Sequence, residues 1–158
     1  MIAKYLSEVN VSNRHNIVIL HCPVTLMETA SAKLREEGLE IIDCGVCLAE
    51  KCKTSNTHKY LSIELQEYLQ EVIGSKAKTI IEGKPKVIGL KNLGILLEPS
   101  LELDALAILE KLSQNIVLLI LWENQILYPA RLHWGVNEEQ YNLDFTNITL
   151  TKVYAYEV

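Results

Sequence analysis

Short, mostly apolar runs are spaced along the chain and separated by longer amphipathic stretches. The runs are residues 17–20, 39–44, 87–90 and 116–122. Runs of this length are typical of strands whose two faces are both buried in a parallel sheet. Ile116–Trp122 is the longest apolar run, and it predicts the centre of that sheet.

Helical periodicity fills the intervals between the predicted strands. The pattern predicts helices over residues 2–9, 25–37, 58–73 and 101–112. Thr25 and Glu28 match a capping box, in which Glu28 would bond back to the Thr25 amide. Gly45–Thr57 is polar and is predicted as a loop. The last part, Gln125–Val158, predicts short strands, of which Val153–Tyr156 would be an edge strand.

Alternating strands and helices predict right-handed βαβ units in an α/β fold, with a three-layer, mostly parallel sheet and short extra strands at the C-terminus. The 158 residues, 49% of them hydrophobic, suit one domain over 1–158. The N-terminus shows no signal-peptide pattern, and no apolar run approaches the roughly 20 residues of a membrane span. The chain is therefore predicted to be cytoplasmic, without a membrane partner.

The formal net charge of −5 bears on possible partners. Nucleic-acid binding relies on a surface of Lys and Arg that neutralises phosphates. No stretch of this chain is dominated by basic residues. Direct nucleic-acid binding is therefore not expected.

The cysteines offer a candidate metal site. Cys44, Cys47, Cys52 and His58 form the pattern C-x2-C-x4-C-x5-H. Three thiolates and an imidazole satisfy tetrahedral zinc. The alternative is that these are buried or incidental thiols, because Cys44 ends an apolar run and free cysteine is among the most buried residue types. In a reducing compartment, structural disulfides are not expected.

The first strand-to-helix turn is the usual phosphate site of such a fold. Residues 22–29 have the length and the terminal threonine, Thr29, of the P-loop G-x-x-x-x-G-K-[ST]. Cys22 and Met27 stand in place of its glycines, and Glu28 in place of its lysine. The substitution of Glu28 puts a negative charge opposite the phosphates.

The predicted third strand lacks a second element of nucleotide hydrolases. Such strands usually end in an acid that holds magnesium. Here Val87–Leu90 is followed by Lys91 and Asn92, with no carboxylate. ATP and magnesium are therefore not predicted as cofactors.

The stretch Leu93–Leu106, residues 109–115, Val117–Trp122 and Asn124 resemble BrxF, the small P-loop protein family of bacteriophage exclusion (BREX) systems. The likeness is clearest over 87–124. It implies a P-loop-NTPase-like fold and a place in phage defence. The family's P-loop glycines and lysine, its strand-end acid and an arginine all differ here, the last two being Lys91 and Gln114. The family's Trp-Asn-Gly turn reads Trp122-Glu123-Asn124.

Taken together, these patterns predict a non-catalytic, P-loop-like subunit of a prokaryotic antiviral complex that acts through protein contacts in a hetero- or homo-oligomer. The alternatives are an ATPase completed by a neighbouring subunit and a small zinc-stabilised interaction module. Aromatic side chains are frequent in interfaces, and the candidate interface residues are Trp122, Tyr128, Trp134 and Tyr141. The same aromatic residues could instead close the core.

Overall fold

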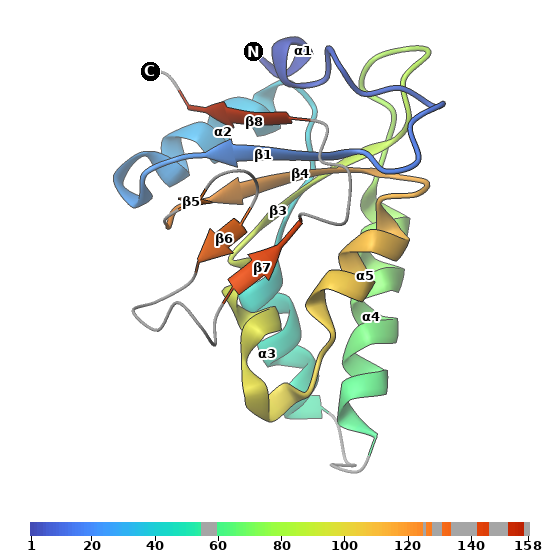
Figure 1. Cartoon of the computed structure of the whole chain (residues 1–158), viewed down its shortest axis with the longest axis vertical. Coiled ribbons are helices and arrows are strands. Elements are labelled where there is room, and N and C mark those ends of the chain that lie inside the picture. Colours follow the sequence, from blue (N-terminus) through green and yellow to red (C-terminus); the bar gives the residue numbers. More distant parts are fainter. Residues whose placement is uncertain (55–59, 125, 128–130, 134–141, 146–151, 157–158) are drawn as a thin grey trace.

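The computed structural model describes residues 1–54, 60–124, 126–127, 131–133, 142–145 and 152–156. Its centre is a five-stranded sheet in the order β2-β3-β4-β1-β8 (Figure 1). All neighbouring strands of this sheet are parallel. The strands are β1 (Ile17–His21), β2 (Ile41–Asp43), β3 (Val87–Lys91), β4 (Val117–Trp122) and β8 (Lys152–Ala155). The predicted α/β class is confirmed.

Strand β4 occupies the middle of the sheet, as its apolar run predicts. Every residue from Val117 to Trp122 is buried. β4 lies between β1 and β3, and β8 is the edge strand beside β1. A strand with neighbours on both sides and helices on both faces can be apolar throughout, which explains why β4 shows no alternation.

Helices cover the two faces of the sheet and make three layers (Figure 1). On one face, α1 (Ile2–Tyr5) and α2 (Met27–Glu36) pack against alternate strand residues such as Val18 and Leu119. On the other face, α3 (Cys44–Thr54), α4 (Leu61–Lys76) and α5 (Ala105–Leu112) pack against the intervening ones, such as Ile19 and Ile120. Two apolar clusters therefore share one sheet.

A small antiparallel sheet follows β4. It contains β5 (Ile126–Leu127), β6 (Arg131–His133) and β7 (Asn142–Asp144), in that order. Leu132, Leu143 and Phe145 are buried in the cluster that also contains α3, α4 and α5. The extra strands predicted at the C-terminus are present: β5, β6 and β7 lie on the α3–α5 face of the parallel sheet, and β8 is its predicted edge strand.

The loop predicted over Gly45–Thr57 is wrong over most of its length, because α3 runs from Cys44 to Thr54. The Asp43 side chain accepts a hydrogen bond from the Val46 amide at 3.0 Å and so caps this helix. Cys44 and Leu48, four residues apart, are both buried on the same helix face. Apolar contacts of this face stabilise the helix, although the polar composition of the segment predicts a loop.

Several predicted boundaries also shift. Helix α1 ends at Tyr5, although Leu6 and Val9 remain buried. Helix α4 continues through Gly74 to Lys76. Between β3 and α5 the chain forms two 3-10 turns, η2 (Leu93–Leu97) and η3 (Pro99–Leu101). Within the part of the chain that the structure describes, no helix has the length and apolar content of a membrane span.

Candidate functional site

The carboxyl end of the parallel sheet contains a topological switch point. From β1 the chain enters α2 on one face, whereas from β4 it enters the β5–β7 sheet on the opposite face. β1 and β4 are adjacent strands. Connections that diverge from adjacent strands leave a crevice between them, where ligands of open α/β sheets bind. The turn after β1, residues 22–29, lies at this crevice.

Backbone amides in this turn bond to the chain's own carbonyls. The Cys22 amide donates to the Trp122 carbonyl at 2.9 Å, and the Leu26 amide donates to the Pro23 carbonyl at 2.9 Å. The Met27 amide donates to Val24, because a 3-10 turn, η1 (Val24–Leu26), precedes α2. Pro23 has no amide hydrogen. A phosphate-binding loop needs its amides to point at the anion, whereas the Cys22, Leu26 and Met27 amides of this turn bond to the chain's own carbonyls.

The capping box predicted for Thr25 and Glu28 is wrong. Helix α2 starts at Met27 with Leu26 as its N-cap, and no side chain caps it. Glu28 is then the second helical residue and not the third, which removes the geometry of a capping box. Its carboxylate instead meets the ammonium group of Lys91, with 3.4 Å between Oε1 and Nζ. Lys91 lies at the end of β3 and is mostly buried, whereas Glu28 is 84% exposed.

Glu28 and Lys91 thus contact each other. A P-loop protein has a lysine where Glu28 stands and an acid at the strand end where Lys91 stands. Here the carboxylate comes from α2 and the ammonium from β3. The two charges offset each other, so the Lys91 ammonium group is paired with Glu28 and does not stand alone toward a phosphate.

Of the other predicted residues of the turn, Cys22 is fully buried, Met27 is half-buried and Thr29 is exposed. Burial raises the pKa of the Cys22 thiol, and the negative charge of Glu123 raises it further. A buried thiol with a raised pKa is a poor nucleophile at neutral pH. Cys22 therefore behaves as a core residue that connects β1 to the turn.

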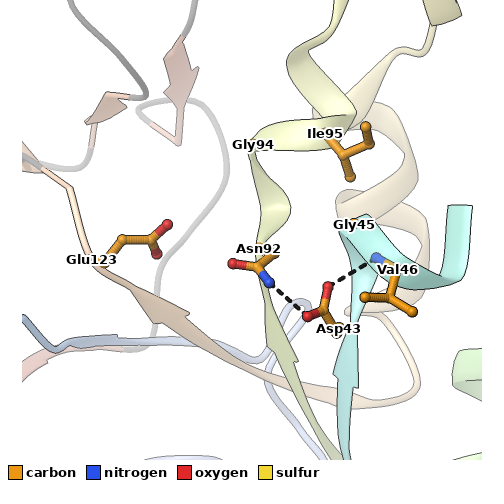
Figure 2. Close-up of a pocket in the computed structure, with 7 residues that line it drawn as sticks. All are labelled: Asp43, Gly45, Val46, Asn92, Gly94, Ile95 and Glu123. Atoms are coloured by element: carbon orange, nitrogen blue, oxygen red, sulfur yellow. Dashed lines mark hydrogen bonds between the residues drawn. The ribbon is translucent and has the colours of Figure 1, made fainter. Parts of the chain in front are cut away.

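A cavity of about 370 Å³ opens beside this turn, at the carboxyl ends of β2, β3 and β4 (Figure 2). Its lining residues are Asp43, Gly45, Val46, Asn92, Gly94, Ile95 and Glu123. The apolar side chains Val46 and Ile95 come from α3 and η2, and the polar groups come from the strand ends. Its two carboxylates make it unsuitable for an anionic ligand.

Asp43 is the centre of this cavity wall. One of its oxygens accepts from the Val46 amide, and the other accepts from the Asn92 side-chain amide at 2.7 Å (Figure 2). Asn92 has a left-handed backbone with φ 56°, which asparagine tolerates better than most residues. The pair connects the ends of β2 and β3. Because both of its oxygens bond to the protein, Asp43 acts here as a structural group.

The three predicted zinc ligands that the structure describes lie on one helix. Cys44, Cys47 and Cys52 are on α3, and His58 lies outside the described residues. Among the described residues, no group of three or more His, Cys, Asp or Glu is arranged to hold a metal ion. Burial raises the pKa of Cys44 strongly. It also raises the pKa of Cys47, which a hydrogen bond with Tyr68 partly offsets.

Of the predicted interface aromatics, only Trp122 is described. Its side chain is 1% exposed and belongs to the apolar cluster under α3, α4 and α5. The Trp122 side chain therefore packs in the core and not at an exposed interface, which is the alternative interpretation of these aromatic residues. Tyr128, Trp134 and Tyr141 lie outside the described residues.

No family model matches the chain, and comparisons with curated proteins and with solved structures find no match either.

Sequence reasoning missed the Asp43–Asn92 pair. The available signal was that each residue directly follows a buried strand, and the carboxyl ends of parallel strands meet at one edge of the sheet.

Proposed function

We propose that this chain is a non-catalytic, P-loop-like subunit of a prokaryotic phage-exclusion complex and acts through contacts with other proteins. The observation that carries the non-catalytic assignment is the closed turn after β1, in which the amides of Leu26 and Met27 bond within the turn. Only the likeness of residues 87–124 to the BrxF family supports the defence context.

Charge adds to this argument. The negative charge of Glu28 would face the negatively charged phosphates of a bound nucleotide. Lys91 already forms an ion pair with Glu28. The neighbouring cavity presents the carboxylates of Asp43 and Glu123. A nucleotide would have to open the turn, break the ion pair and approach two further acids. Each step opposes ATP binding, whereas none hinders a protein contact.

Calorimetric titration with ATP and magnesium tests the non-catalytic part. We expect no heat of binding for the wild-type chain at millimolar nucleotide. A well-characterised P-loop ATPase serves as the positive control. Micromolar binding that disappears in Thr29→Ala would overturn the proposal, because Thr29 is exposed and its loss leaves the fold intact.

Phage plating tests the defence part in a host that carries this gene with its neighbouring genes. Deletion of the gene should abolish protection against phage, and a plasmid copy of the wild-type gene should restore it. Thr29→Ala should restore protection equally well, because no nucleotide chemistry depends on it. Protection that persists without the gene would contradict the assignment to defence.

A further inference from the structure

A second, larger depression lies away from the P-loop-like turn. It has a volume of about 650 Å³ and is lined by the segment joining β3 to α5, the start of α5, and strand β7, which contacts α5. We call this depression the leucine groove. Its lining residues are Leu96, Leu97, Glu98, Pro99, Glu102, Leu103, Asp104, Ala105, Leu106, Asn142, Leu143 and Asp144.

The apolar part of the leucine groove is a set of leucines. Leu97, Leu103 and Leu106 are only partly buried and pack on the core beneath them. Leu96 and Leu143 are buried. Partly buried leucines therefore line this depression, and concave sites lined mostly by apolar side chains are typical of binding sites.

Carboxylates surround the leucines. Glu98, Glu102, Asp104 and Asp144 all line the groove, and no Lys, Arg or His is among the described residues that line it. Asp104 accepts a hydrogen bond from the Ala107 amide, and Asp144 pairs with Arg131 from outside the lining. Among the described lining residues every charged side chain is an acid, and Asp144 is paired with Arg131, so the carboxylates of Glu98, Glu102 and Asp104 favour an occupant of opposite charge.

Glu102 adds a backbone observation. It is exposed and has a left-handed conformation with φ 51°. Among the described non-glycine residues only Asn92 shares this conformation. Glycine would adopt it without strain, and residues that keep such strain cluster at functional sites. Glu102 ends η3 in this conformation, with its amide donating to the Pro99 carbonyl at 3.1 Å, and its side chain lines the groove.

We propose that the leucine groove binds an amphipathic helical segment of a partner protein, with leucine-type side chains on one face and Lys or Arg beside them. This inference rests on the proposed function as a subunit that acts through protein contacts, and it names the chemistry of the partner. Helix-in-groove recognition places apolar anchors in a groove with charges at its rim. Nucleic acid is a poor occupant, because its phosphates would face these carboxylates.

Fluorescence anisotropy tests the proposal with a labelled synthetic helical peptide of leucine and lysine as the probe. The test variant is Glu98→Lys/Glu102→Lys. The control is Glu36→Lys/Glu82→Lys, which changes two exposed glutamates outside the groove lining. Both double variants change the net charge equally, so bulk attraction of a basic peptide affects them alike. Melting curves confirm that each variant is folded.

We expect the wild-type chain to bind the peptide with micromolar affinity, and the groove variant to weaken binding by about tenfold or more. The control variant should weaken it by less than about threefold. Leu103→Ala, which leaves every charge in place, should also weaken binding.

Equal weakening in the groove and control variants would overturn the proposal, since it would indicate bulk attraction only. A dimer in sedimentation velocity that Glu98→Lys/Glu102→Lys dissociates would also overturn it, since a second copy would then be the occupant. The peptide assay needs neither nucleotide nor phage. Its failure is therefore distinguishable from a failure of the proposed function, which is measured by ATP titration and plating.

Discussion

Asp43 and Asn92 show how single residues organise the carboxyl end of the sheet. Asp43 caps α3 through the Val46 amide and bonds the side chain of Asn92 beyond β3. A strand-end aspartate is typical of a capped turn, but the sequence predicts a loop after Asp43 and not the helix that it caps. Its bond to Asn92 is not visible, because the two residues are far apart in the chain and meet only when β2 and β3 pair.

Asp43→Ala should lower the free energy of unfolding by about 1–4 kcal/mol, since it removes a helix cap and leaves Asn92 without this partner. Asp104→Ala is the matched control. Asp104 caps α5 through the Ala107 amide, so its loss should cost about 0.5–2 kcal/mol. Urea denaturation of both variants measures the difference. Equal costs would mean that the bond to Asn92 contributes nothing.

At the scale of elements, the strands follow from their apolar runs, whereas α3 and the start of α2 do not. Helix α3 is stabilised by its buried face, with Cys44 and Leu48 against the core, rather than by its composition. Helix α2 begins after a 3-10 turn, which moves Glu28 out of the capping position. In both cases contacts with the rest of the fold override a local sequence signal.

Gly89 shows that a residue within a strand also depends on contacts with the rest of the fold. A Cβ atom at Gly89 would lie 2.8 Å from Cγ1 of Ile41 and 3.3 Å from the Glu40 carbonyl oxygen. Gly89→Ala should therefore destabilise the protein by about 1–3 kcal/mol, because the backbone before β2 must move.

Gly74→Ala is the control for this change. Gly74 lies in α4 and has nothing within 4 Å of an added Cβ atom. Alanine should stabilise the helix here by about 0.5–1 kcal/mol. Thermal and urea unfolding of both variants should give shifts of opposite sign. If Gly89→Ala left stability unchanged, β2 and β3 would have to lie farther apart at this position than the structure shows.

At the scale of the whole molecule, the two apolar clusters share β4 as a common wall. Leu119 faces α1 and α2, and the next residue, Ile120, faces α3, α4 and α5. Both side chains are fully buried. Because the clusters are joined through one strand, loss of either should unfold the other.

Leu119→Ala and Ile120→Ala should each lower the free energy of unfolding by about 2–5 kcal/mol. Far-UV circular dichroism and tryptophan fluorescence should give coincident transitions in both variants. Val24→Ala, at a residue that is 72% exposed, is the control and should change stability by less than about 0.5 kcal/mol. Separate transitions for the two signals would contradict a single cooperative unit.

The sequence by itself determined the strands of the parallel sheet, the α/β class, the central place of β4 and the opposite charges of Glu28 and Lys91. These features follow from local properties: the length of apolar runs, their β-branched content and the sign of a charge. Only the tertiary structure decided that Glu28 pairs with Lys91, that Asp43 pairs with Asn92 and that leucines and acids form a groove. Each of these contacts joins residues far apart in the chain, and their distances depend on strand order, which no local pattern encodes.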